Sequence, residues 1–281
     1  MHPSIRYNPL AMAAANHALR LTNRGTTFVF VATTGRSGSA ALASVFQAVR
    51  DVASFHEPWP AMTDDVPDGE DRSAYFARLF RNDKRFLVRR AAHGHRCYLE
   101  TNHQFVKRFA DLAVAEFGRA LRIIHLVRDP VSVARSFHRI DSIPGRTERG
   151  RRWLLVPEDP QNLLPMVDLL RDGGALPHDL HRCLWYWYET EARIKALKAR
   201  TPGIVWKDLR TEDLNDRERV INLFEGLGLD YDHRRLDDLV GVRRNLKRHY
   251  GEERVPAEQA EAMHDELRAA LAERFGEDAL A

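Results

Sequence analysis

The chain has 281 residues, of which 44% are hydrophobic and 30% are charged, and its 43 Lys and Arg against 40 Asp and Glu give a formal net charge of +3. This composition excludes a disordered chain, a collagen-like repeat and a disulfide-rich scaffold, and the even charge balance disfavours a dedicated nucleic-acid binder. Two cysteines provide no disulfide framework, and no apolar run approaches the length of a membrane span, so we expect a soluble, cytoplasmic protein.

Apolar runs alternate with segments of helical spacing along the chain. We expect strands at 27–32, 53–55, 97–100, 121–127 and 203–206, and helices at 8–24, 39–50, 72–90, 105–117, 131–139, 184–200, 217–227 and 256–275. This alternation predicts one α/β domain over residues 1–281, a P-loop-type three-layer fold whose mainly parallel sheet is flanked by helices. Residues around 141–182 are rich in Pro, Gly, Asp and Arg, and we expect an irregular insertion there rather than core.

The first candidate site lies between the strand at 27–32 and the helix that follows, where residues 33–39 read TTGRSGS. Glycines let a backbone fold tightly around an oxyanion, and the free N–H groups of a helix N-terminus attract one. Arg36 adds a charge-assisted donor, and Ser37 and Ser39 add hydroxyls. The loop is no Walker A motif, because Ser39 stands where that motif requires Lys. The alternative is an ordinary tight turn with serine as the helix cap.

The second candidate site follows the strand at 121–127, where Arg128-Asp129-Pro130 precedes Ser136. Proline suits the first turn of the next helix. An arginine and a hydroxyl that meet at the carboxyl end of a strand are suited to a second phosphate. Taken alone, the segment is equally typical of a salt-bridged turn.

The two segments together resemble the sulfotransferases that use 3′-phosphoadenosine 5′-phosphosulfate (PAPS). In that family a strand–loop–helix of the type Arg/Lys-Ser-Gly-Thr/Ser binds the 5′-phosphosulfate, and an Arg-x-Pro with Ser eight residues after the Arg binds the 3′-phosphate. The Arg-Ser-Gly form is closest to the bacterial, carbohydrate and tyrosylprotein enzymes. The resemblance implies PAPS as cofactor, PAP as product and no metal. It also implies cofactor contacts from Gly35, Arg36, Ser37, Gly38, Ser39, Ala40, Arg128 and Ser136.

Two later segments resemble the family less closely. Trp206 begins a Trp-Lys-Asp-Leu run where the family often has Tyr-Glu-Asp-Leu, and it is a candidate to stack on adenine; the alternative is a core tryptophan. Arg244, Asn245 and Lys247 resemble a late basic segment that closes over the nucleotide, although a solvated charge run would read the same way.

Sulfuryl transfer needs a base for the acceptor proton and a cation for the leaving phosphate. Arg36 is placed for the leaving group. Glu57 is the favoured base, because it follows a strand predicted beside the first one and some relatives place a catalytic Glu there. His56 is the alternative base, and the pair otherwise only turns the chain. Asn102 and His103 follow the next strand, where they either orient the acceptor or cap a helix.

Two other functions are alternatives to the sulfotransferase prediction. A P-loop kinase or NTPase is disfavoured by the missing Lys and by the absence of a clear magnesium-holding Asp after a strand. The other is a non-catalytic PAP-binding protein. The acceptor remains open among small molecules, carbohydrates, lipids and peptides, as does the oligomeric state.

Overall fold

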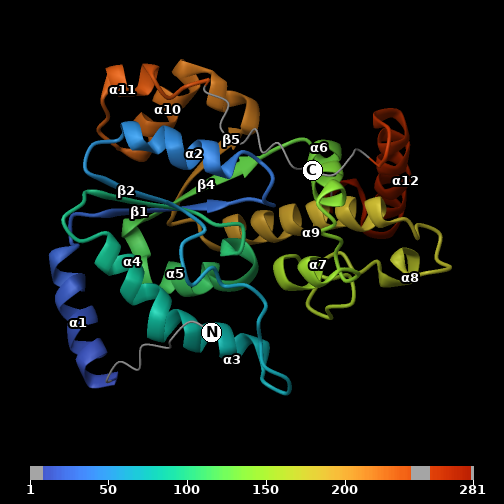
Figure 1. Cartoon of the computed structure of the whole chain (residues 1–281), viewed down its shortest axis with the longest axis horizontal. Coiled ribbons are helices and arrows are strands. Elements are labelled where there is room, and N and C mark those ends of the chain that lie inside the picture. The colour runs from blue at the N-terminus through green and yellow to red at the C-terminus, as the bar shows by residue number, and fades with distance from the viewer. Residues whose placement is uncertain (1–8, 242–253, 280–281) are drawn as a thin grey trace.

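Five strands form one parallel sheet in the order β2-β3-β1-β4-β5 (Figure 1). The computed structural model describes residues 9–241 and 254–279. The strands are β1 (Thr27–Ala32), β2 (Val52–His56), β3 (Cys97–Thr101), β4 (Leu121–Val127) and β5 (Val205–Arg210). Strand β1 lies at the centre, and its residues 28–32 are all buried, as expected of an apolar strand covered on both faces. The predicted α/β fold with a mainly parallel sheet is confirmed.

Helices cover both faces of the sheet and complete three layers. In Figure 1, α2 (Ser39–Val45), α10 (Arg217–Leu227) and α11 (His233–Asp237) lie above the sheet. Below it lie α3 (Arg72–Leu79), α4 (Arg85–Ala91), α5 (Ala110–Phe117) and α9 (Asp179–Arg200). The remaining helices are α1 (Pro9–Thr22), α6 (Pro130–Arg139), α7 (Glu148–Trp153), α8 (Val167–Leu170) and α12 (Ala257–Phe275). Within the described ranges, none combines the length and apolarity needed to cross a membrane.

Alternate residues of β1 build two separate cores. Val29 and Val31 pack with α2 and α10, whereas Phe28 and Phe30 pack on the opposite face. There Phe30 stacks on Phe105, with ring centroids 5.2 Å apart. Each core buries side chains from segments far apart in sequence, so burial of β1 stabilises both outer layers at once.

Three of the sequence-based expectations are wrong in position or character. The strand before Glu57 was expected beside the first strand, but β2 pairs with β3, which lies between β2 and β1. The last strand is β5 (Val205–Arg210) rather than 203–206, because its polar, half-exposed residues hide the strand pattern at the edge of the sheet. The segment around 141–182 is not outside the core. Its apolar residues form a third core with α6, α9 and α12, among them the buried Ile143, Leu154 and Met166.

The connections that leave β1 and β3 diverge. After β1 the chain turns to α2 on one face, and after β3 it turns to the π-helical turn η3 (Phe105–Phe109) on the other. Adjacent parallel strands whose connections part in this way leave a crevice at their carboxyl ends, where ligands of α/β proteins bind. The residues that follow β1 and β3 are therefore where a site is expected.

His125 joins the sheet to α9. Its ring contacts Glu191 of α9 through Nε2 (2.7 Å) and Asp208 of β5 through Nδ1 (3.2 Å). Burial opposes the charged imidazolium, but the hydrogen bonds and charges of Glu191 and Asp208 outweigh burial and raise the pKa of His125. The protonated ring is therefore favoured in the folded state.

Because the folded-state pKa is raised, the stabilisation from His125 is complete below the unfolded pKa of about 6.5 and is lost as the pH rises through the folded value. We predict that His125→Asn lowers the free energy of unfolding by about 1.5–3 kcal/mol at pH about 5.5, and by less at pH about 9. Urea denaturation at the two pH values measures the difference. A pH-independent loss would contradict the charged pairing.

Candidate functional site

The loop between β1 and α2 has an unusual backbone. Gly35, Arg36 and Gly38 all have positive φ, at 84°, 59° and 81°. Arginine adopts this conformation at a cost of about 1–2 kcal/mol, so the surrounding structure must hold it there. Gly38 is the N-cap of α2 and provides no side-chain cap, which leaves the first N–H groups of the helix without one.

Hydroxyl groups hold the loop from inside. Ser37 is buried, and its hydroxyl donates to the Gly35 carbonyl (3.0 Å) and contacts the Thr34 hydroxyl (3.0 Å). Thr211, which follows β5, donates to the Ser37 carbonyl (2.8 Å). The Ser37 side chain therefore shapes the loop from inside, whereas Arg36, Gly38, Ser39 and Ala40 are partly exposed.

The second arginine segment meets this loop directly. Arg128, at the end of β4, donates from Nη1 to the Arg36 carbonyl (2.9 Å). The Arg36 side chain in turn donates from Nε to the hydroxyl of Ser136 in α6 (2.9 Å). Two segments about 100 residues apart thus form one basic site. Asp129 caps α6 by accepting from the Ser132 N–H (2.6 Å).

Glu57 follows β2 and lies close to the residues that follow β3. Its N–H donates to the Thr101 carbonyl (3.1 Å), its φ is 48°, and its carboxylate Oε1 lies 3.5 Å from His103 Nε2. The side chain is 29% exposed, so solvent or a ligand can reach it. The neighbouring His56 instead contacts the Thr101 hydroxyl through Nδ1 (2.9 Å).

A buried ion pair supports the loop that carries Glu57. Lys84 Nζ lies 2.6 Å from the Glu100 carboxylate and donates to the Pro60 carbonyl (3.0 Å). Asn102 donates to Glu100 (2.9 Å) and to the Ala61 carbonyl (3.3 Å). Lys84, at the end of the turn between α3 and α4, and Glu100 and Asn102, at the end of β3 and just after it, therefore fix the path of the chain after Glu57.

His103 lies between the two halves of the site. Its ring stacks on Trp153 of α7, with centroids 5.7 Å apart and planes within 8°. A Cβ atom on Gly35 would meet His103 Nδ1 at 2.9 Å, so only glycine fits the loop here. Burial, followed by the charge of Lys107, holds the pKa of His103 well below its usual range, and the ring is neutral near pH 7. The sequence pointed to His103 only by its place after a strand.

Other contributors carried little sequence signal. Lys107, Trp153 and Tyr186 contact the His103 region from η3, α7 and α9, and the contact of Trp153 depends on tertiary packing of the segment around 141–182. The one available signal was the four-residue spacing of His103 and Lys107, which places two side chains on one side of a helical turn.

The structure does not bring every candidate residue to this site. Trp206 lies near the start of β5, paired with Ile123, and packs against the core on the face opposite α2. Its indole donates to the Thr201 hydroxyl (3.2 Å). Arg244, Asn245 and Lys247 lie outside the described residues. Among the described residues, no group of three His, Cys, Asp or Glu side chains is placed to hold a metal ion.

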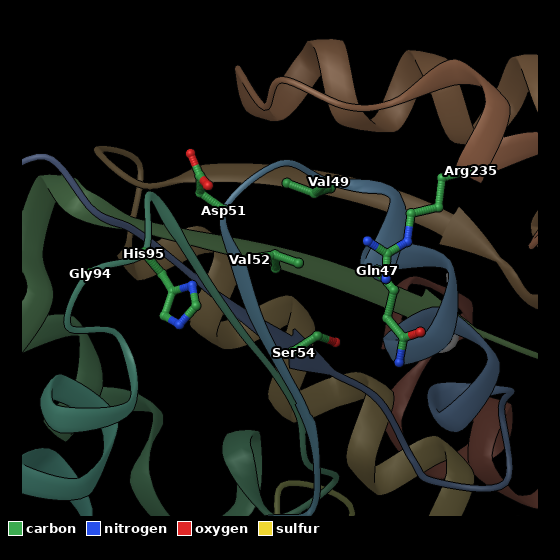
Figure 2. Close-up of a pocket in the computed structure, with 8 residues that line it drawn as sticks. All are labelled: Gln47, Val49, Asp51, Val52, Ser54, Gly94, His95 and Arg235. Carbon is green, nitrogen blue, oxygen red and sulfur yellow. The ribbon is translucent and has the colours of Figure 1, made fainter.

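A pocket of about 390 Å³ lies elsewhere, along the free edge of β2 (Figure 2). It is near the start of that strand, whereas Glu57 follows its end. Its lining contains no residue of either arginine segment: Gln47, Val49, Asp51, Val52, Ser54, Gly94, His95 and Arg235.

Comparison with known proteins gives matches among solved structures alone, since no family model and no curated protein matches the chain. The sulfotransferase domain from the curacin biosynthetic pathway is 14% identical over 86% of this chain and 97% of that one, with a TM-score of 0.49. The sulfotransferase domain of the Synechococcus PCC 7002 olefin synthase is 15% identical over 89% and 94%, with a TM-score of 0.44. Retinol dehydratase, solved with androsterone and the inactive cofactor PAP, is 14% identical over 92% and 69%, with a TM-score of 0.29.

We predict that Gly35→Ala lowers the free energy of unfolding more than Gly69→Ala does. Gly69 has a similar φ (80°) but open space around it. Alanine at position 69 therefore meets the same backbone strain without a steric contact, which makes Gly69→Ala a matched control. The contact with His103, held between Trp153 and Glu57, adds a further cost of about 1–3 kcal/mol. Urea denaturation of the two variants measures the difference, and equal losses would show that His103 yields.

Proposed function

We propose that the chain is a PAPS-dependent sulfotransferase, which moves a sulfuryl group from PAPS to an acceptor hydroxyl or amine. The observation that carries the proposal is the direct contact of the two arginine segments, in which Arg128 bonds the Arg36 backbone and Arg36 bonds Ser136. One molecule with two phosphate groups is the ligand that such a pair suits, and PAPS carries a 5′-phosphosulfate and a 3′-phosphate.

The residues present fit this cofactor. The loop with three positive φ angles and the uncapped start of α2 supply backbone donors for the 5′-phosphosulfate, together with Arg36. Arg128 and Ser136 supply a guanidinium and a hydroxyl for the 3′-phosphate. Ser37 would contribute its backbone N–H rather than its hydroxyl, because the hydroxyl donates to the Gly35 carbonyl within the loop. PAPS, when bound, supplies the sulfuryl group and a phosphate leaving group.

The side chains divide the chemistry between them. Glu57 would accept the proton of the acceptor hydroxyl or amine when the sulfuryl group that PAPS supplies passes to the acceptor and the 5′-phosphate leaves. Arg36 and the loop amides stabilise the negative charge that develops on that phosphate oxygen. His103, neutral and in contact with Glu57, orients the carboxylate. His56 is the less suited base, because its Nδ1 is engaged with Thr101.

The kinase alternative finds less support in the site. Asp129, the acidic residue that follows β4, accepts a hydrogen bond from the Ser132 N–H as the cap of α6. Its carboxylate thus serves the helix rather than a magnesium ion. Magnesium-dependent ATP hydrolysis would nevertheless restore that alternative, and tight PAP binding without transfer to any acceptor would favour a non-catalytic PAP-binding protein.

We predict that PAP binds the wild-type chain in calorimetry and that Arg128→Ala weakens binding by about 10–100-fold, the effect of one charge-assisted contact of about 1.5–3 kcal/mol. ATP and ADP, which lack a 3′-phosphate, should bind weakly to both proteins. Arg122→Ala is the matched control, since Arg122 lies at the other end of β4 and bonds backbone carbonyls there. Absence of PAP binding to the wild type, or equal losses in the two variants, would refute the proposal.

We predict that Glu57→Gln lowers kcat by about 10²–10⁴-fold while PAP affinity is retained, because the amide keeps the shape of the carboxylate but accepts no proton. The assay follows sulfur-labelled PAPS with an acceptor identified by screening hydroxyl and amine compounds. A larger loss in His56→Gln than in Glu57→Gln would move the base to His56.

A further inference from the structure

Lys107 is a buried lysine whose ammonium group faces neutral partners. Only 7% of the residue is exposed. Its Nζ donates to the Trp153 carbonyl (2.7 Å) and to the Tyr186 hydroxyl (3.0 Å), and it lies 3.2 Å from Nδ1 of His103. A buried charge that meets a carbonyl, a hydroxyl and an imidazole is costly, so its position calls for an explanation.

The direction of two of these hydrogen bonds is fixed by the partners. A carbonyl only accepts, so Lys107 donates to Trp153. The Tyr186 hydroxyl gives its own proton to the Thr34 carbonyl (2.6 Å), and burial raises the pKa of Tyr186, which keeps that proton in place. Tyr186 therefore accepts from Lys107. One N–H of the ammonium group remains, and it faces His103 Nδ1.

That remaining N–H decides where the proton of the neutral His103 ring sits. When Nδ1 accepts from Lys107, the ring carries its proton on Nε2, the atom that lies 3.5 Å from Glu57 Oε1. A donor then faces the carboxylate. When Nδ1 is protonated instead, its N–H and the Lys107 ammonium group are two donors that face each other; the Thr34 backbone also hydrogen-bonds the ring. An unprotonated Nε2 would then face a carboxylate oxygen, two acceptors with no proton between them.

We infer that Lys107 is a positioning residue, whose ammonium group fixes His103 in the Nε2–H tautomer and so holds the Glu57 carboxylate in place through His103. The effect of Lys107 on turnover rests on the proposed function, whereas its effect on the His103 tautomer does not. We expect Lys107 to contact neither acceptor nor cofactor and to act only through His103.

The charges around the two groups set the pH range of this arrangement. Burial, followed by the neighbouring Arg108, holds the pKa of Lys107 well below its usual range, and Glu57 opposes that shift. Beyond its neutral contacts, Lys107 lies in the field of Glu57, Asp64, Arg108 and Arg193, and the titratable or charged groups around His103 are Lys107, Glu57, His56 and Arg36. As the pH rises until Lys107 loses its proton, the nitrogen gains a lone pair toward Nδ1, and the tautomer should change.

The test reads the tautomer directly, by two-bond ¹H–¹⁵N correlation of the histidine rings in the labelled full-length chain without ligand. The His103 signals are assigned by their loss in His103→Gln. We expect the Nε2–H pattern in the wild type near neutral pH, the Nδ1–H pattern in Lys107→Met, and the wild-type pattern in Tyr186→Phe. Tyr186→Phe is the matched control, because it removes two bonds of the same buried network, one from Lys107 and one to the Thr34 carbonyl, but leaves the donor to His103.

Two results would overturn the inference: an Nδ1–H ring in the wild type near neutral pH, or an unchanged tautomer in folded Lys107→Met. If Lys107→Met does not fold, a pH titration of the wild type decides, since the Nε2–H pattern should give way to Nδ1–H at alkaline pH, and a constant pattern would contradict the assignment.

Activity supplies a second, separate readout. With the proposed function, Lys107→Met should lower kcat by between about tenfold and 10⁴-fold, the upper bound being the effect of a wrong histidine tautomer in hydrolases, and leave PAP affinity unchanged. The expected tautomers together with no PAP binding would refute the sulfotransferase proposal and leave the role of Lys107 toward His103 standing. PAP binding together with an unchanged tautomer in Lys107→Met would leave the sulfotransferase proposal standing and refute the role of Lys107 toward His103.

Discussion

The contact between Arg36 and the segment after β4 is the interaction on which the site depends. Arg36 adopts a left-handed backbone conformation that arginine disfavours, and two bonds from that residue, one accepted by its carbonyl and one donated by its side chain, reach Arg128 and Ser136. Because β1 and β4 are neighbours in a parallel sheet, their carboxyl ends bring these residues together wherever the chain goes between them. The sheet order, rather than the sequence distance, makes the site.

Placing two guanidinium groups at one sheet edge is unfavourable in the absence of an anion, because like charges repel. Two features of the local structure bear on this repulsion. Arg128 bonds a backbone carbonyl, which has no charge to neutralise it, and the nearby His103 is kept neutral by burial and by the charge of Lys107. Positive charge is thereby concentrated at the loops, while Glu57 provides a carboxylate that faces His103.

The sequence predicted the centre of the fold better than its periphery. The strand at 27–32 and the strand at 121–127 coincide with β1 and β4, because buried apolar runs have one interpretation in an α/β pattern. Strand β5 was displaced by two to four residues, since its exposed Val205 and Arg210 and half-buried Lys207 resemble a loop. The segment around 141–182 was misjudged because its few apolar residues are separated by turns, and only their joint packing with α6, α9 and α12 makes them a core.

The candidate site shows the same limit. Arg36, Arg128 and Ser136 were recognisable because motif spacing reports loops at the ends of strands, and Glu57 because it also follows a strand. The contact of His103 with Gly35 and the stacking of Trp153 on His103 join three segments, and no local pattern encodes such a meeting. The role of Trp206 stays a prediction: its local sequence resembles a nucleotide-binding segment, and its position near the start of β5 lies away from the loops.

The choice of lysine at two buried positions follows from what the site requires. The chain has 37 Arg and 6 Lys, so arginine is its ordinary cation. Yet Lys84 and Lys107 are both buried beneath the site, the first against the Glu100 carboxylate and the second against neutral groups. Arginine keeps its charge at any accessible pH and offers a broad planar fork, whereas an ammonium group is compact, points three donors in separate directions and can give up its proton. Only an ammonium group can donate to Trp153, Tyr186 and His103 from one nitrogen atom. The geometry at position 107 therefore requires lysine, and positive charge alone is not enough.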